Sequence, residues 1–130
     1  MLLVSAKKGP SQIHGLGLIS QEFISAGTRI WRFESGFDVE LSEEQASLLS
    51  PVAQQQLHYY AYFDRRTQRF VLSSDDDRFT NHSNKPNTAL DLDGVSTIAL
   101  GDIQPGEEIT WDYYTPGQAA SPLEQKRLET

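Results

Sequence analysis

The chain has 130 residues and a mass of 14.6 kDa, a length typical of one domain with a single hydrophobic core. It contains no cysteine, which excludes disulfides, thiolate zinc sites and a cysteine nucleophile. Its net charge of −7, from 18 acidic and 11 basic residues, argues against binding to a nucleic-acid backbone.

No stretch of the sequence is apolar over the roughly 20 residues that a membrane span needs. The first residues place a short apolar patch before Lys7 and Lys8, which is the reverse of the order in a signal peptide. We therefore expect an intracellular protein, cytoplasmic or nuclear, with no targeting signal and no membrane contact.

Short apolar runs separated by glycine and proline predict a mainly β fold, a β-rich α+β chain. Asp93-Gly94 predicts a hairpin between two of these runs, and Pro105-Gly106 predicts the turn before the last strand. The predicted strands are residues 2–5, 16–20, 28–33, 69–73, 88–92, 95–100 and 108–111.

Helix signals concentrate in an insertion at about residues 42–58. Ser42 and Gln45 form a capping-box pattern at a helix start. This helix should end before Pro51, because proline disfavours the helical conformation in the residue before it. Pro51 can open a second short helix that runs toward Leu57. A further capping pattern at Ser121 predicts a C-terminal helix of about two turns, which is marginal unless it docks.

The acidic residues are unevenly distributed. Residues 75–112 contain nine acidic residues against two basic ones, a difference equal to the whole net charge. Solubility and turn formation account for such a composition. An acidic concavity would also attract a basic partner such as a lysine-rich peptide.

Three segments carry unusual residues for their length. In the first, Gly15 and Gly17 flank Leu16 at the entrance to a predicted strand, where glycine lets the backbone approach a ligand closely. A plain tight turn explains the same pattern. It is not a dinucleotide fingerprint, because neither the third glycine nor a helix follows.

The second segment, residues 78–87, is dense in polar side chains. Asn81 and Asn87 can close Asx turns, and Pro86 fixes a backbone dihedral. His82 suits either a structural hydrogen bond or a functional role.

The third segment, residues 106–114, alternates Ile109, Trp111 and Tyr113 on one face of a strand. A core strand with an aromatic end is the alternative to a functional interpretation.

We predict no metal site. The three histidines share no ligand spacing, and consecutive aspartates at 75–77 cannot all face one ion. A hydrolase with paired carboxylates lacks support, since the acids are too many to choose among.

Taken together and in this order, the three segments resemble a SET domain, the fold of many protein-lysine methyltransferases. The resemblance assigns residues 1–114 to the SET domain and residues 115–130 to a C-terminal tail. It implies several small curved sheets, a short helical insertion and a threaded, knot-like C-terminal region. Threading would bring Asn81, His82 and Tyr113 together, although such topology is rare.

The resemblance also implies roles for individual residues. One set would bind S-adenosylmethionine (SAM), one would line a lysine channel, and one tyrosine would be catalytic. These are Gly15, Leu16, Gly17, Arg78, Asn81 and His82 for the cofactor, Trp111 and Tyr113 for the channel, and Tyr113 for catalysis, with no metal.

The implied reaction is SAM-dependent methylation of a lysine in a basic protein or peptide, such as a histone tail. The lysine must react as the neutral amine, and deprotonation at pH 7 costs about 4–5 kcal/mol. An apolar channel beside the sulfonium charge lowers the lysine pKa, and aromatic walls attract the cation.

Several positions depart from the family pattern. Asn84 stands where the family usually has cysteine, Ser74-Asp75 replaces Gly-Asn, and cysteine-rich flanking segments are absent. Trp111 is bulkier than the usual phenylalanine, so we expect low methylation states. The alternatives are a SET-fold module that binds a partner protein without turnover, and a structural homodimer.

Overall fold

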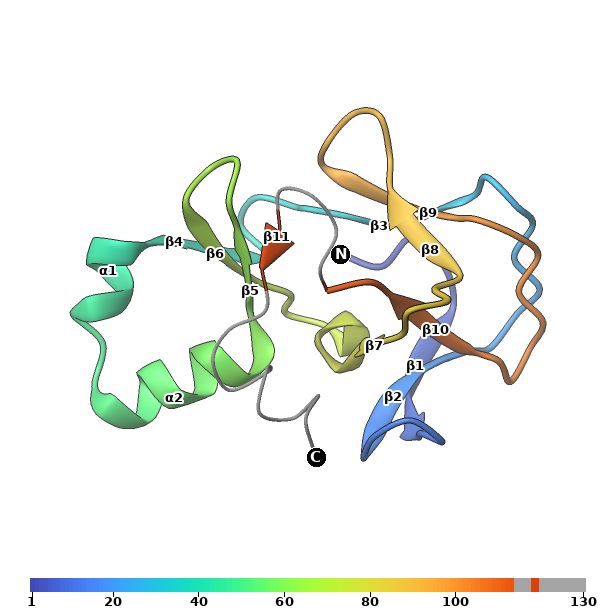
Figure 1. The fold of residues 1–130 in the computed structure, drawn as a ribbon, viewed down its shortest axis with the longest axis horizontal. Helices are drawn as coiled ribbons and strands as arrows, with labels where there is room; N and C mark the ends of the chain where they lie inside the picture. Colours follow the sequence, from blue (N-terminus) through green and yellow to red (C-terminus); the bar gives the residue numbers. More distant parts are fainter. Residues whose placement is uncertain (114–117, 120–130) are drawn as a thin grey trace.

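The computed structural model describes residues 1–113 and 118–119, and the fold is mainly β with two α-helices between strands (Figure 1). The elements, in chain order, are β1 (Ala6–Pro10), β2 (Leu16–Ser20), β3 (Arg29–Arg32), β4 (Val39–Ser42), α1 (Glu43–Ser47), α2 (Pro51–Tyr60), β5 (Tyr62–Asp64), β6 (Arg69–Leu72), the 3-10 turn η1 (Asp76–Phe79), β7 (Asn81–His82), β8 (Thr88–Leu90), β9 (Ser96–Ala99), β10 (Glu108–Trp111) and β11 (Gln118–Ala119). The helix expected from Ser121 lies outside the described residues.

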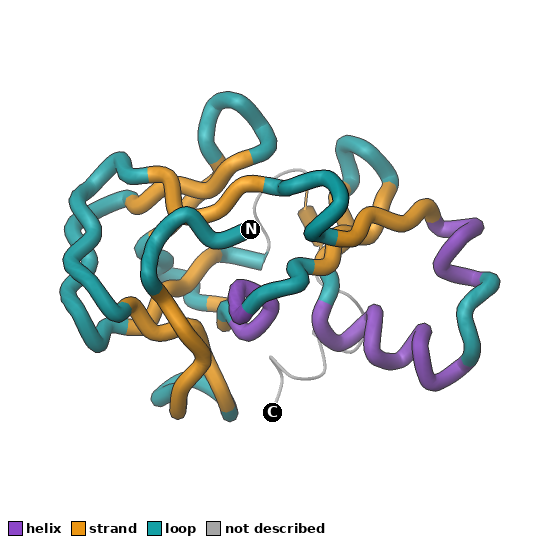
Figure 2. Tube along the Cα trace, turned by 180° about the vertical axis from the view of Figure 1, so that it is seen from behind, coloured by secondary structure: helices purple, strands orange, loops and turns teal. Residues whose placement is uncertain are grey.

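Three small sheets organise these strands. Their orders are β1-β2-β10-β7, β11-β5-β6-β4 and β3-β9-β8. The second sheet and the two α-helices lie at one end of the molecule, and the other two sheets lie at the opposite end (Figures 1 and 2). The expected mainly β fold of several small sheets with a helical insertion is therefore confirmed.

Strands β7 and β10 bring two distant segments into contact. They pair in parallel, with Thr110 opposite Asn81 and Trp111 opposite His82. Strand β10 also pairs antiparallel with β2, the strand that begins at Leu16 and contains Gly17. All three segments singled out in the sequence thus meet at β10.

Each end of the molecule has its own apolar core. Burial of aliphatic side chains supplies roughly 25 cal/mol per Å² of apolar surface. The first core packs the sheets of β2, β3, β9 and β10, and the second packs α1 and α2 against β4 and β6. Their buried members are Leu18, Ile24, Ile30, Ala99, Ile103 and Ile109 in the first core, and Ala46, Leu57 and Ala61 in the second.

The helical insertion follows its local signals. The Ser42 hydroxyl accepts from the Gln45 N–H at 3.1 Å, and the Gln45 side chain accepts from the Ser42 N–H at 2.8 Å. Helix α2 begins at Pro51 as predicted and continues past Leu57, because the Ala61 N–H still bonds to the Leu57 carbonyl. The predicted capping box and the break between the helices are confirmed.

The strand expected at residues 2–5 is wrong. Leu2 forms only an isolated bridge with Trp31, and its N–H bonds to the Asp75 carboxylate at 2.7 Å. The strand is β1, which pairs along its whole length with β2. Its residues, Ala-Lys-Lys-Gly-Pro, form no apolar run, so pairing with β2 decides its position.

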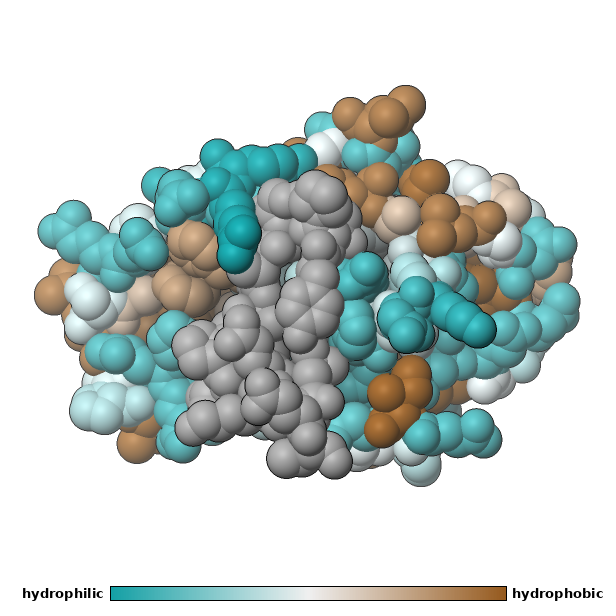
Figure 3. Space-filling view, in the orientation of Figure 1, coloured by the Kyte–Doolittle hydropathy of each residue, from teal (hydrophilic) through white to brown (hydrophobic). Residues whose placement is uncertain are grey.

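The hairpin predicted at Asp93-Gly94 is confirmed. Strands β8 and β9 pair antiparallel, Gly94 takes a φ of 73°, and the Asp93 carboxylate accepts from the N–H groups of Val95 and Ser96. Figure 3 shows a largely hydrophilic face with apolar groups at the top, where this hairpin ends and Leu92 and Val95 are exposed. Within the described residues, no helix has the length and apolarity to cross a membrane.

Candidate functional site

Asn81 holds the glycine loop against the centre of the sheet. Its side chain is buried, and the amide nitrogen donates to the carbonyls of His14 at 3.0 Å and Leu16 at 3.1 Å. The same nitrogen lies 3.1 Å from the Ser11 hydroxyl and 3.0 Å from a Glu108 oxygen. The side chain therefore fixes the loop that the sequence singles out.

The two glycines of this loop are required for different reasons. Gly15 takes a φ of 49°, which favours glycine, and a Cβ there would meet open space. At Gly17, a Cβ would come within 2.5 Å of the Glu108 carboxylate. Gly17 thus keeps room for an acidic side chain, and Gly15 shapes the turn.

Glu108 is a site residue that sequence reasoning missed. One carboxylate oxygen accepts from the Ser11 hydroxyl at 2.7 Å and the other contacts the Asn81 amide. The carboxylate thus stands beside the Gly17 backbone. Glu108 is the first residue of the last predicted strand, but it follows Glu107 directly, and the sequence gives no signal that singles it out among the neighbouring acids.

His82 faces the backbone of Tyr113. Its Nδ1 accepts a hydrogen bond from the Tyr113 N–H at 3.0 Å, which requires an unprotonated Nδ1. A carboxylate oxygen of Asp112 lies 3.6 Å from the same nitrogen. This distance is long for a hydrogen bond, and Nδ1 carries no proton to donate to the carboxylate while it accepts from Tyr113. The side chain of His82 therefore orients the tyrosine.

Tyr113 and Trp111 form an aromatic corner with Tyr62 of β5. The Tyr113 hydroxyl donates to the Thr80 carbonyl at 2.6 Å. The Trp111 ring packs edge-on against Tyr113 at 6.0 Å and against Tyr62 at 5.3 Å between ring centroids. Tyr62, which sequence reasoning missed, lies in a short strand that the apolar pattern does not mark.

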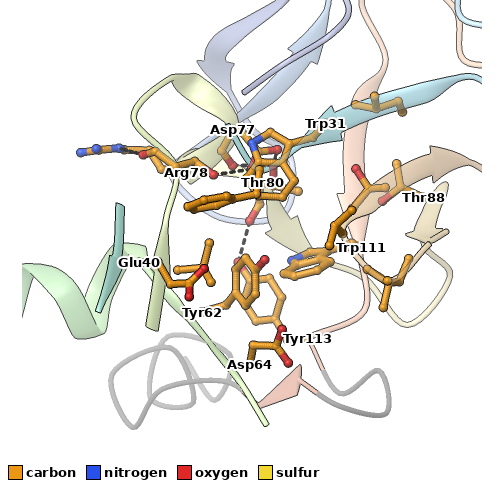
Figure 4. A pocket seen from close by; sticks show the side chains of 18 of the residues that line it. Trp31, Glu40, Tyr62, Asp64, Asp77, Arg78, Thr80, Thr88, Trp111 and Tyr113 are labelled. Carbon is orange, nitrogen blue, oxygen red and sulfur yellow. Dashed lines mark hydrogen bonds between the residues drawn. The ribbon is translucent and has the colours of Figure 1, made fainter. Parts of the chain in front are cut away.

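This corner borders a cavity of about 380 Å³ between the two ends of the molecule (Figure 4). Figure 4 shows Trp31, Asp77 and Thr80 at one end of it, Tyr62, Tyr113 and Asp64 at the other, and Trp111 at the side. Aromatic rings with carboxylates among them suit a cationic side chain.

Arg78 lies at this cavity and away from the glycine loop. Its Nε donates to the Ser73 carbonyl at 3.0 Å, and its guanidinium lies 5.5 Å from the centre of the Tyr60 ring. The structure therefore brings Asn81 together with Gly15, Leu16 and Gly17, and brings His82, Trp111 and Tyr113 together. It does not bring Arg78 to the first group.

The three consecutive aspartates have separate contacts. Asp75 accepts from the N–H groups of Leu2 and Asp77, and Asp76 accepts from the N–H of Lys8. Asp77 accepts from the Ser73 hydroxyl at 2.8 Å inside the cavity wall. Among the residues that the structure describes, no cluster of histidine and acidic side chains could hold a metal ion.

The enclosed cavity shifts the ionisation of two of its residues. Burial raises the pKa of Asp77 to about 6, opposed by hydrogen bonds from Ser73 and Thr80 and supported by the nearby charge of Asp75. Burial also raises the pKa of Tyr62, and the charges of Asp77 and Asp64 add to this effect. Burial is the largest cause of both shifts, and both residues remain partly exposed.

Comparison with known proteins places this geometry in a family. The SET domain family matches residues 15–114. A search of curated proteins found no match. One similar solved structure is a Plasmodium falciparum protein assigned as a histone methyltransferase, at 23% identity and a TM-score of 0.60, covering 88% of this chain and 96% of that one.

Two further structures come from Polycomb Repressive Complex 2 of Chaetomium thermophilum. A humanized mutant bound to an inhibitor has 20% identity and a TM-score of 0.66, and an autoinhibited form bound to SAM has 18% and 0.65. Each covers 97% of this chain, which spans only 16% of the length of those chains. These similarities show a shared fold, and the family match covers most of the sequence. The chain belongs to the SET domain family.

Proposed function

We propose that the protein is a SAM-dependent methyltransferase that acts on a lysine side chain of a basic protein or peptide. The observation that carries this proposal is the hydrogen bond from the Tyr113 hydroxyl to the Thr80 carbonyl, beside Trp111 and at the edge of an aromatic cavity. Family membership and a SAM-bound structure among those with the same fold support it.

The residues at the glycine loop fit the amino-acid part of SAM. The carbonyls of His14 and Leu16 and the Glu108 carboxylate converge on the Asn81 amide, so this region is rich in acceptors. Acceptors and negative charge suit an ammonium group. When bound, SAM would supply an electrophilic methyl group on a sulfonium, while Asn81 and Glu108 would hold the loop in place.

The corner around Tyr113 suits the reacting amine. Because the Tyr113 hydroxyl donates its hydrogen bond to the Thr80 carbonyl, the lone pairs of the phenolic oxygen remain available as acceptors. The phenolic oxygen and the Thr80 carbonyl can then hold a polarised methyl group or an amine N–H in line. Alignment of two reactants in this way can lower a barrier by roughly 7–11 kcal/mol.

The acidic residues around the cavity support a basic substrate. Glu40, Asp64 and Asp77 all contribute to its wall. Such a wall would speed the association of a lysine-rich peptide, with a rate that falls as salt rises. A histone tail has the required chemistry, as does any lysine-rich segment.

The test is transfer of labelled methyl from SAM to a histone mixture and to a whole-cell protein extract. The Tyr113→Phe variant removes only the hydroxyl, and the Tyr59→Phe variant is the matched control on the surface of α2, where Tyr59 is exposed. We expect label on a discrete band with the wild type and the control, and none with Tyr113→Phe. Binding of SAM without any transfer would indicate a partner-binding module, and absence of SAM binding would reject the proposal.

A further inference from the structure

The cavity contains a carboxylate to which the proposed function gives no role in the chemical step. Of the other acids in its wall, Glu40 pairs with Arg69 at 3.3 Å, Asp64 pairs with Arg66 at 3.1 Å and Asp93 pairs with Arg29 at 3.6 Å. Asp77 has no ion-pair partner within the described part of the chain, and its oxygens contact hydroxyl groups only. A carboxylate in this state is open to a cationic ligand that enters the cavity.

A second polar group lies at the same end of the cavity. Trp31 is 4% exposed, and none of the described residues accepts a hydrogen bond from its Nε1. Trp31 and Asp77 both line the cavity, and Figure 4 shows them together at one end. A buried N–H without an acceptor is costly, so a polar acceptor placed beside the Trp31 Nε1 would stabilise this end of the cavity.

Asp77 is connected to the reacting corner through a single residue. The Thr80 hydroxyl donates to the Asp77 carbonyl at 2.7 Å and lies 3.4 Å from a carboxylate oxygen. The carbonyl of the same Thr80 accepts the Tyr113 hydroxyl at 2.6 Å. Thr80 therefore contacts both the Asp77 carboxylate and the Tyr113 hydroxyl, beside which the amine would react.

On the basis of the proposed function, we propose that Asp77 is the proton acceptor for the substrate ammonium, and that Thr80 and Trp31 Nε1 orient the groups between which the proton moves. This role rests on a carboxylate that directly precedes Arg78 and lines the cavity.

The step balances in atoms and charge. An N–H bond of the ammonium breaks, its electron pair remains on nitrogen, and the proton passes to a carboxylate oxygen of Asp77. The amine lone pair would then be free to form the N–C bond with the methyl group that SAM supplies, and the C–S electron pair would stay on sulfur. The acid form of Asp77 afterwards releases its proton to solvent.

The enclosed environment favours this transfer. It converts a positive and a negative group into two neutral ones, and burial disfavours both charged forms. The charged and titratable groups around Asp77 are Asp75 and Arg78 on its own turn, the Met1 amino group and the phenol of Tyr62 on β5. Burial outweighs the others and raises the pKa of Asp77 to about 6, so the carboxylate is ionised at neutral pH.

The test is the pH dependence of kcat/KM for a lysine peptide that the enzyme methylates. With Asp77 as the acceptor, the protonated substrate reacts, so the wild-type profile should be flat from about pH 7 to about pH 9 and fall below about pH 6. The Asp77→Asn substitution should lower kcat/KM at neutral pH by about 10²-fold. The kcat/KM of this variant should be proportional to the fraction of neutral lysine, so it should rise about tenfold per pH unit.

Two variants complete the design. Asp76→Asn is the matched control, since Asp76 contacts the Lys8 backbone outside the cavity, and its profile should equal that of the wild type. Trp31→Phe keeps a ring and removes the N–H, so its rate should fall while SAM affinity is unchanged.

The outcomes separate the two proposals. A wild-type rate that itself rises about tenfold per pH unit across this range overturns the role of Asp77, whether or not the variant folds. The same conclusion follows if Asp77→Asn keeps the flat profile. If the wild type methylates nothing, the proposed function fails first and this step with it.

Discussion

The His82 imidazole accepts the backbone N–H of Tyr113 at 3.0 Å, so the two motifs of the site are joined by a side chain as well as by strand pairing. The resemblance assigned His82 to the cofactor, whereas its Nδ1 contacts the tyrosine. This contact fixes the backbone from which the Tyr113 hydroxyl reaches Thr80.

Replacing His82 by alanine should therefore impair the tyrosine more than the cofactor site. The Tyr113 N–H would lose its acceptor, which costs about 1–3 kcal/mol for a buried donor. We expect lower kcat with nearly unchanged SAM affinity, measured by calorimetry. His82→Asn can restore an acceptor and should recover part of the rate. A large loss of SAM affinity with normal kcat would contradict this role.

Gly17→Ala should disturb the loop through a direct clash. The new Cβ would come within 2.5 Å of the Glu108 carboxylate. We expect weaker SAM binding and a lower free energy of unfolding, by the roughly 1–3 kcal/mol typical of overpacking. The double variant Gly17→Ala with Glu108→Ser should recover stability, measured by denaturant unfolding. Equal behaviour of the single and double variants would argue against the clash.

Asp77→Asn should change how stability depends on pH. The pKa of Asp77 in the folded state, about 6, lies above the ordinary aspartate value of 3.8, so the wild type loses stability as pH rises through this range. The advantage of the asparagine variant in unfolding free energy should grow between pH 4 and pH 8, by at most about 3 kcal/mol. Urea unfolding at both pH values measures it.

Asp93→Asn is a control for which the expected pH dependence of the unfolding free energy has the opposite sign. Hydrogen bonds from Ser96 and Val95 lower the pKa of Asp93 to about 2, so its contribution to stability is present at neutral pH and is lost as pH falls through that value. Its asparagine variant should be less stable than the wild type at neutral pH and no less stable in acid. If the stability of both variants relative to the wild type changed with pH in the same direction, the assigned pKa shifts of Asp77 and Asp93 would be refuted.

Leu57→Ala should destabilise the helical insertion. Leu57 is 4% exposed in the core beneath α1 and α2. Removal of such a side chain typically costs 2–5 kcal/mol. Val52→Ala on the exposed face of α2 is the control and should change the unfolding free energy by less than about 0.5 kcal/mol.

Trp111→Phe should raise the number of methyl groups added to the product. The indole packs against Tyr62 and Tyr113 at the cavity, so a smaller ring would leave more room beside the amine. We expect mainly monomethyl-lysine from the wild type and higher states from the variant, measured by mass spectrometry. Abundant trimethyl-lysine from the wild type would reject this role for Trp111.

Much of the fold is predictable because its signals are local. The bounds of β2 and β10 match the apolar runs, and the capping box at Ser42 and the proline at residue 51 fix both helices. Strands β1 and β7 are not marked in this way. Neither contains an apolar run, since β1 is Ala-Lys-Lys-Gly-Pro and β7 is Asn-His, and pairing with β2 and β10 makes them strands.

The sequence allowed site residues to be predicted only where they lie in a recognisable motif. Asn81, His82 and Tyr113 stand out in the sequence, and the structure brings each into a defined contact. Glu108 and Asp77 are two among many acids, and nothing in the sequence tells which of them face the loop or the cavity. Burial and three-dimensional packing make that distinction.

The most direct test is tandem mass spectrometry of a histone mixture after incubation with SAM and the protein, with Tyr113→Phe in parallel. The account predicts methyl groups on the side-chain nitrogen of lysine, present with the wild type and absent with a folded variant. Methylation on another residue type, or equal methylation by the variant, would contradict it.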